Sequence, residues 1–282
     1  MISVSGLSFS YTKKPFITNM SFNVSKGEIF GFLGPSGAGK STVQKILTGM
    51  LTSFTGNVSV LNTDIKHIEK SFYEKIGVDF EFSSLFEKMT ARENLRFFSS
   101  LYSSPSADIE GLLKKVDLHK DADKKVSAFS KGMKSRLNFI KALVHDPDLI
   151  FLDEPTSGLD PSNAAVMRQL IIEQKNLGKT IILTTHNMYD ASELCGRVAF
   201  IVDGSIKALD SPWNLMHKNT NFNVVYSWLE NGEKKERTVP VTQTSSDEKL
   251  QSLIKQNALI SIHSCEPNLN DVFAEITGRV LV

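Results

Sequence analysis

The sequence contains little of what marks secreted, cysteine-ligated or membrane-embedded proteins. Its two cysteines, Cys195 and Cys265, lie far apart and have no paired ligands nearby. This favours two free thiols in a reducing compartment over a disulfide or a metal site. No stretch approaches the roughly 20 apolar residues that a membrane span requires, and residues 1–5 do not resemble a signal peptide. We therefore expect a cytosolic chain, with any membrane role supplied by a partner.

An excess of either charge is also absent. The 32 basic and 31 acidic side chains leave a net charge of +1, so nothing indicates a general attraction to nucleic acid or to anionic lipid. Hydrophobic residues make up 41% of the chain and charged residues 22%, which is typical of a globular protein. A chain of 282 residues is long enough to bury one large core and a smaller one.

One glycine-rich run fills every fixed position of the Walker A pattern G-x-x-x-x-G-K-[ST]. It follows a strand-like segment at residues 28–33 and precedes helix-like residues 43–47. A loop in this setting directs backbone N–H groups and the positive end of a helix dipole at phosphate, so a chance glycine turn is the poorer interpretation. Lys40 can then reach β- and γ-phosphates, and Ser41 can bind Mg²⁺. The predicted nucleotide-binding residues are Gly34, Pro35, Ser36, Gly37, Ala38, Gly39, Lys40, Ser41 and Thr42.

A second apolar run ends in two acids. Residues 148–153 have the continuous apolar character of a buried parallel strand and end in Asp153, which Glu154 follows directly. Asp153 can support the ligand shell of Mg²⁺. Glu154 is placed to orient or deprotonate a water molecule. Acids after buried strands are common, so this pattern gains its weight from the motifs around it.

The order of elements predicts an α/β fold with a parallel sheet, because buried strands alternate with helices. Thr90 and Glu93 have the spacing of a capping box at the start of one helix. The predicted strands cover residues 16–24, 28–33, 56–61, 148–153 and 180–185, and the predicted helices cover residues 92–102, 109–116, 136–144 and 162–176.

The pattern changes after Pro212. Residues 222–228 alternate between apolar and mostly polar, as in a half-buried strand, and Asn231-Gly232 is a strong hairpin signal. A helix at residues 247–256, a strand at residues 258–264 and a helix that begins near Asn268 follow. The tail is therefore predicted to be a small α+β module.

Three further motifs occur in a fixed order between these elements, and with them the chain resembles the nucleotide-binding subunit of an ABC transporter over residues 1–212. The resemblance implies a P-loop NTPase core with an antiparallel β subdomain, a helical subdomain at about residues 83–145, and a C-terminal accessory module at residues 213–282. The motifs are Phe129, Ser130, Lys131, Gly132 and Met133, like the signature written LSGGQ; Ser157, Gly158, Leu159 and Asp160, like the D-loop; and Thr185 with His186, like the H-loop.

The resemblance also implies roles for single residues. Tyr11 is similar to the aromatic residue that stacks on adenine, although a buried tyrosine at a strand end is the alternative. Lys40, Glu154 and His186 would be the catalytic residues, with His186 at the γ-phosphate. Further contacts to ATP, made across a head-to-tail dimer, would come from Ser130, Lys131, Gly132, Met133 and Asp160.

The chain departs from the family pattern at two places, one of which is the signature, where the usual second glycine and final glutamine are absent. At the other place, where the family has a glutamine, this chain has Glu81, which with Ser41 and Asp153 completes the predicted Mg²⁺ ligands. The alternative for Glu81 is a surface carboxylate with the register misjudged. The Lys131-Gly132-Met133 signature and the segment 266–273 resemble subunits that serve bacterial drug, antibiotic, lipid or polysaccharide exporters, which favours export.

The expected function is an ATP-hydrolysing subunit that powers a separate transmembrane permease. We expect it to pair with a second nucleotide-binding subunit, identical or closely related, and to lie at the cytoplasmic face of the membrane through the permease. ATP and Mg²⁺ are the expected cofactors, and no nucleic acid is expected. Another P-loop enzyme such as a kinase or GTPase would leave the signature unexplained. A soluble ABC-type ATPase acting on DNA or ribosomes is the remaining alternative, and such proteins usually carry two nucleotide domains or a long coiled-coil insertion.

Overall fold

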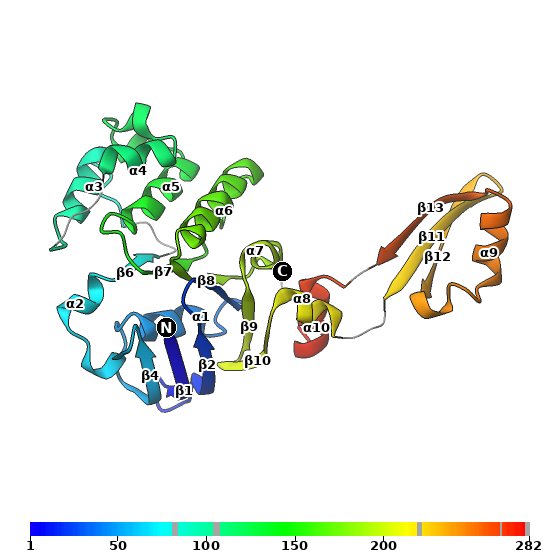
Figure 1. The fold of residues 1–282 in the computed structure, drawn as a ribbon, viewed down its shortest axis with the longest axis horizontal. Helices are drawn as coiled ribbons and strands as arrows, with labels where there is room; N and C mark the ends of the chain where they lie inside the picture. The colour runs from blue at the N-terminus through cyan, green and yellow to red at the C-terminus, as the bar shows by residue number, and fades with distance from the viewer. Residues whose placement is uncertain (81–83, 104–107, 219–221, 266, 280–282) are drawn as a thin grey trace. The chain divides into compact units, whose positions relative to one another are not determined.

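The computed structural model describes residues 1–282 except 81–83, 104–107, 219–221, 266 and 280–282. The chain divides into two compact units, of which the first is Met1–Ser211 and the second begins at Pro212. Figure 1 labels the elements of both units. No helix among the described residues is both long enough and apolar enough to cross a membrane.

A six-stranded, mostly parallel sheet forms the centre of the first unit, in the order β10-β9-β3-β8-β7-β6. β3, β7 and β8 are buried along their whole length, as strands covered on both faces should be. Parallel pairing places the carboxyl ends of neighbouring strands at one edge, where Leu33 pairs with Thr185 and Asp153 with Thr184. The strands are β3 (Ile29–Leu33), β6 (Ile76–Asp79), β7 (Leu149–Asp153), β8 (Thr180–Thr185), β9 (Arg197–Val202) and β10 (Ser205–Asp210).

A smaller antiparallel sheet, ordered β2-β1-β4-β5, packs against the central sheet and α1. Aromatic contacts link the two sheets, with the rings of Phe22 and Phe30 stacked at 5.7 Å between centroids. The sequence did not predict β1, whose partners β2 and β4 are supplied by segments later in the chain. The elements are β1 (Ile2–Phe9), β2 (Ile17–Val24), β4 (Phe54–Val60), β5 (Thr63–Asp64) and α1 (Lys40–Leu47).

Three helices gather at the opposite end of the first unit from the antiparallel sheet (Figure 1). They are α3 (Ala91–Ser99), α4 (Ile109–Lys115) and α5 (Lys131–Lys141). The capping box is confirmed, because Thr90 and Glu93 exchange side-chain to backbone hydrogen bonds. For α5, the predicted start at residue 136 is wrong. Ser130 accepts a hydrogen bond from the Met133 N–H, so the helix begins at Lys131 and ends at Lys141.

The remaining elements of the first unit connect these layers. The longest is α6 (Pro161–Asn176), which Asp160 caps by accepting from the N–H groups of Ser162 and Asn163. The others are α2 (Lys70–Tyr73) and α7 (Met188–Leu194), with short 3₁₀ turns at Ile65–His67, His119–Asp121 and Val126–Ala128.

The second unit has an antiparallel sheet of its own, ordered β12-β11-β13. The Asn231-Gly232 hairpin is confirmed, and both residues have positive φ angles, of 54° and 82°. One small core stabilises this sheet and α9, and it consists of Tyr226, Trp228, Val239, Leu250 and Leu253. The elements are α8 (Pro212–His217), β11 (Asn223–Glu230), β12 (Glu233–Pro240), a 3₁₀ turn at Val241–Gln243, α9 (Glu248–Lys255), β13 (Leu259–Cys265) and α10 (Leu269–Thr277).

Candidate nucleotide-binding and catalytic site

The glycine-rich loop joins the end of β3 to the start of α1. Gly39 has a φ of +113°, and a Cβ at this position would come within 2.6 Å of the Ile17 side chain, so only glycine fits. α1 begins directly after it at Lys40, with no side-chain cap and no acidic residue in its first turn. No acidic residue of the helix itself therefore offsets the positive end of its dipole, which suits this end to bind an anion such as phosphate.

The buried Lys40 side chain folds back over this loop. Its ammonium donates to the carbonyl oxygens of Gly34, at 2.7 Å, and Pro35, at 3.1 Å. These contacts hold the positive charge at the mouth of the loop. A phosphate group in the loop could take over the donors that Lys40 now gives to the carbonyls.

Two oxygen ligands meet across the gap between α1 and β7. The Ser41 hydroxyl lies 3.4 Å from Oδ1 of Asp153, and the Thr184 hydroxyl on β8 also donates to Asp153. Hydroxyl and carboxylate oxygens suit a hard cation such as Mg²⁺. Nowhere in the described parts of the chain do three or more His, Cys, Asp or Glu side chains converge as a metal site. A Mg²⁺ ion here could take oxygen ligands from Ser41 and Asp153 and complete its shell with phosphate and water oxygens, as it commonly does.

Glu154 is held in an unusual backbone conformation beside these ligands. Its φ is +52°, in the left-handed region that side chains other than glycine rarely adopt. Its N–H donates to the Thr184 carbonyl at 2.9 Å. One carboxylate oxygen lies 2.9 Å from Nδ1 of His186, and the other accepts from the Thr185 hydroxyl at 3.2 Å. The His186 side chain is about half-exposed, whereas that of Glu154 is mostly buried.

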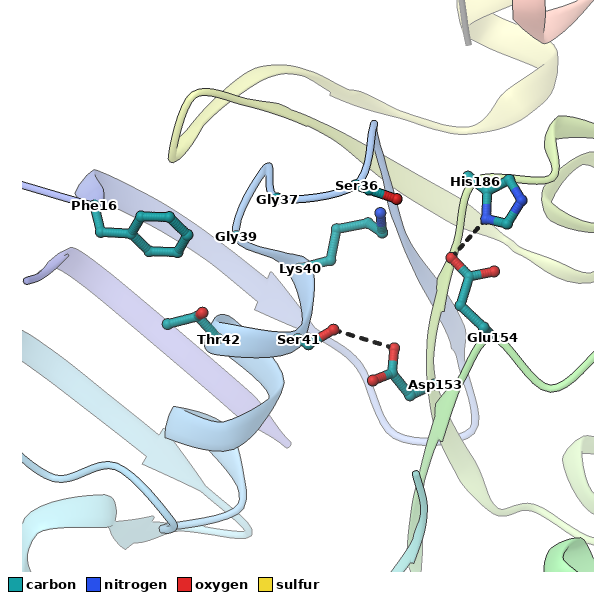
Figure 2. Close-up of a pocket in the computed structure, with 10 residues that line it drawn as sticks. All are labelled: Phe16, Ser36, Gly37, Gly39, Lys40, Ser41, Thr42, Asp153, Glu154 and His186. Atoms are coloured by element: carbon teal, nitrogen blue, oxygen red, sulfur yellow. Dashed lines mark hydrogen bonds and ion pairs between the residues drawn. The ribbon is translucent and has the colours of Figure 1, made fainter. Parts of the chain in front are cut away.

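These groups line one cavity of about 240 Å³. Figure 2 shows the lysine and serine of the loop on one side and Asp153, Glu154 and His186 on the other. Three segments that are distant in the sequence thus supply the phosphate-binding loop, the adjacent pair of Asp153 and Glu154, and His186. The lining residues are Phe16, Ser36, Gly37, Gly39, Lys40, Ser41, Thr42, Asp153, Glu154 and His186.

The aromatic residue at the edge of this cavity is one that sequence reasoning missed. Phe16 lines the cavity, and its ring packs edge-on against Tyr11 at 5.4 Å. Tyr11 is exposed, and its hydroxyl lies 3.0 Å from that of Thr42. The buried alternative for Tyr11 is therefore wrong. The stacking of Tyr11 on adenine stays a prediction. Phe16 is a second candidate for that contact. The only sequence signal for Phe16 is its position five residues after Tyr11 in the same loop.

The signature motif lies outside the cavity around Lys40, although Lys131 lines a neighbouring cavity of about 340 Å³ together with Asp153 and Glu154. Ser130 caps α5, and none of Ser130, Lys131, Gly132 and Met133 lines the cavity around Lys40. Gly132 lies against Asn163, since a Cβ on it would come within 2.7 Å of that side chain. The signature therefore sits beside the start of α6.

The D-loop lies next to the signature. The Lys131 side chain reaches Gly158, which has a φ of +64°. Asp160 caps α6 beyond it, and hydrogen bonds from the Asn163 side chain and backbone lower the pKa of the Asp160 carboxyl. In one chain, Ser130 thus lies outside the cavity that holds the glycine-rich loop and the two acids, whereas Lys131 lines the neighbouring cavity with those acids.

Glu81 lies outside the described residues, so its role as a Mg²⁺ ligand stays a prediction. Just before it, at the end of β6, Asp79 is buried and accepts a hydrogen bond from the Asn138 amide of α5. Burial raises the pKa of Asp79 to about 7, although the charge of Lys141 opposes the rise. Burial in turn lowers the pKa of Lys141. Sequence reasoning missed this pair, because the two residues meet only through the packing of α5 on β6.

The fold and this cavity define a nucleotide-binding protein of the P-loop class. Comparisons with known proteins narrow the class. The family model described as ABC transporter matches residues 17–157. A fluoroquinolones export ATP-binding protein of Mycobacterium tuberculosis (strain CDC 1551 / Oshkosh) is 46% identical over 100% of this chain and 94% of its own length. The Nod factor export ATP-binding protein I of Rhizobium meliloti (strain 1021) is 35% identical over 99% of this chain and 89% of its own length.

Solved structures agree on the fold. CbiO1 from Clostridium perfringens, part of an ABC transporter complex, matches with a TM-score of 0.69 and 28% identity over 76% of this chain and 89% of that one. A dimeric ATP-binding cassette bound to ADP and phosphate matches with a TM-score of 0.67 over 75% of this chain and 98% of that one, and at 24% identity it supports the fold alone. The chain belongs to the ABC transporter family and is an ATP-binding, ATP-hydrolysing subunit.

Proposed function

We propose that this chain powers an ABC exporter and that two nucleotide-binding subunits complete two ATP sites in a head-to-tail dimer. The observation that carries the proposal is the position of Ser130, which lies outside the cavity of its own chain. Lys40, Asp153 and Glu154 line the cavity, whereas Ser130 lies outside it. Head-to-tail pairing would place the signature of one subunit over the cavity of the other, so that each ATP contacts both.

In this proposal each residue of the cavity has a separate task. Lys40 holds the β- and γ-phosphates, and Ser41 and Asp153 hold Mg²⁺. When bound, the cation would neutralise part of the negative charge of the phosphates. Glu154 orients the attacking water and accepts its proton. His186, next to Glu154, donates to the γ-phosphate region.

The proposed permease contact is an apolar groove of about 330 Å³ between the central sheet and the helical region. Exposed Met50, Tyr73 and Leu101 line it together with Phe98. Such a groove fits one face of an amphipathic helix. We propose that a cytoplasmic helix of a transmembrane permease lies in it, which would hold the chain at the cytoplasmic face of the membrane.

Export as the direction of transport is supported by the relatives, whose names all specify export. Those names cover two chemically unlike cargoes, fluoroquinolones and Nod factors. Because both occur with similar ATPase subunits, we propose that the permease selects the cargo.

Mixing two inactive variants tests the shared sites. Lys40→Ala should abolish binding of the phosphates, and Ser130→Arg should block the signature, so each variant alone should lack turnover. In a mixed head-to-tail dimer, the intact loop of the Ser130→Arg chain would face the intact signature of the Lys40→Ala chain. The mixture should then hydrolyse ATP. A mixture as inactive as its components would overturn the shared-site proposal.

The permease contact can be tested in membranes. The full chain, tagged and expressed in its native host, should co-purify with a multi-span membrane protein from detergent-solubilised membranes, and Leu101→Asp should reduce the recovery. Leu177→Asp is the matched control, because Leu177 is 64% exposed and Leu101 63%. Co-purification with ribosomes or DNA instead of a membrane protein would favour a soluble ABC-type ATPase.

A further inference from the structure

The two acids at the end of β7 each have a threonine partner on β8. Asp153 pairs in register with Thr184, whose hydroxyl donates to the Asp153 carboxylate. The two residues that follow, Glu154 and Thr185, are paired in the same way, because the Thr185 hydroxyl donates to Glu154 at 3.2 Å. Successive side chains of a strand point to opposite faces, so the two hydroxyls cannot exchange partners. The strand end therefore supplies one hydroxyl to the metal ligand and a separate one to the candidate base.

The local hydrogen bonds fix the direction of the Thr185 hydroxyl. Its oxygen accepts from the backbone N–H of Asn187 at 3.0 Å. A hydroxyl has a single proton to donate, and the carboxylate of Glu154 is the acceptor within reach. Thr185 is buried, with 1% of its surface exposed.

Thr185 is also the more rigidly placed of the two groups that hold Glu154. His186 binds the other carboxylate oxygen but is about half-exposed. Thr185 belongs to the buried strand β8, where it pairs with Leu33 of β3. The left-handed backbone of Glu154 is costly and persists only where the surroundings determine it.

We propose that Thr185 is a positioning residue for ATP hydrolysis, whose hydroxyl fixes the carboxylate of Glu154 in the orientation that receives the proton of the attacking water. The inference rests on the proposed role of Glu154 as the general base. Thr185 is not among the residues that line the cavity around Lys40, and its hydroxyl donates to Glu154. Small misplacements of a catalytic group have large effects on rate, so loss of the hydroxyl should lower turnover without weakening ATP binding.

The test compares Thr185→Val, which keeps the shape, with Thr185→Ser, which keeps the hydroxyl. Thr185→Val should lower kcat by about ten- to a hundredfold with KM for ATP unchanged, and Thr185→Ser should retain most of the turnover. Thr180→Val is the matched control. Thr180 is buried on the same strand, its hydroxyl accepts from the Gly27 N–H outside the cavity, and its loss should leave kcat unchanged.

A second comparison separates positioning from general damage. In a Glu154→Gln background, Thr185→Val should cause no further loss of the residual rate, because the group that it positions is already gone. A full additional loss there, or a Thr185→Val enzyme with wild-type kcat, would overturn the inference. If Glu154→Gln itself left turnover intact, the proposed function of Glu154 would fail instead, so the two failures are distinguishable.

Discussion

The two units of this chain use β-structure in opposite ways. The central sheet of the first unit contains parallel strands that are buried on both faces. Because these strands are parallel, their carboxyl ends meet at one edge, and the loop, Asp153 and Glu154 all emerge there. The second unit has three antiparallel strands with a core of five side chains against α9, and β12 is exposed along almost its whole length. Antiparallel strands end alternately at both edges, so no single edge collects functional side chains. The comparison assigns the chemistry to the first unit.

The comparisons differ in how much of the chain they cover. The solved structures cover 75–77% of it, close to the share that the first unit makes up. The export proteins align over 99–100% of it. We infer that the first unit is the ATPase common to the family, and that the second serves a narrower group. Substitutions should therefore divide into those that stop turnover and those that change only stability.

The largest expected effect is that of Glu154→Gln in the first unit. The amide cannot accept the proton of the attacking water, so turnover should fall by at least about a hundredfold, while ATP binding is retained. The variant should accumulate as an ATP-bound dimer, visible by size-exclusion chromatography with ATP.

Glu193→Gln is the control for this charge change, because Glu193 is an exposed residue of α7 outside the cavity. It should have wild-type turnover and form no stable dimer. A Glu154→Gln chain that stays monomeric at saturating ATP would contradict the head-to-tail arrangement.

A comparable loss of turnover, with a different binding profile, is expected from Ser130→Arg. The arginine would fill the space that the partner's nucleotide needs, so hydrolysis should stop. Because Ser130 does not line the cavity of its own chain, the monomer should still bind ATP with wild-type affinity. Equilibrium binding of a fluorescent ATP analogue at low protein concentration measures this. Loss of monomer affinity as severe as in Lys40→Ala would show that the signature acts within its own chain.

The sequence predicted most elements of both units, because their signals are local. The glycine loop, the capping box of Thr90 and Glu93, and the Asn231-Gly232 hairpin each depend on residues close in sequence. What it could not predict depends on contacts between distant segments. β1 needs two later strands as partners, and Thr185 reaches Glu154 only because β7 and β8 pair in one particular register.

A smaller effect, on stability alone, is expected in the second unit at acid pH. Asp247 caps α9 by accepting from the Leu250 N–H, and it also accepts from the Tyr226 hydroxyl at 2.8 Å and pairs with Arg237. The hydrogen bond from Leu250 contributes most to lowering the pKa of the Asp247 carboxyl. A lowered folded-state pKa stabilises the unit above the unfolded-state value of about 3.9, and this contribution is lost as the pH falls through the folded-state value.

Tryptophan fluorescence can follow this unit separately, because both tryptophans, Trp213 and Trp228, lie after Pro212. In a Trp213→Phe background, the urea midpoint reported by Trp228 should fall between about pH 5 and pH 3. Asp247→Asn keeps an acceptor at the N-cap but loses the charge that pairs with Arg237, so its midpoint should start lower at pH 5 and should change less with pH. Equal pH dependence in the two proteins would remove Asp247 as the titrating group.

The smallest expected effect on nucleotide binding is that of removing the second unit altogether. Every residue that lines the cavity lies before Ser211, and the first unit has its own extensive core. A chain truncated after Ser211 should therefore bind Mg²⁺-ATP with the affinity of the full chain and unfold in a single cooperative transition. Isothermal titration calorimetry and urea unfolding measured by circular dichroism would show both. A broad, non-cooperative transition would mean that the second unit completes the core of the first. Wild-type binding with normal unfolding would instead restrict the second unit to tasks other than ATP binding, such as the choice of permease.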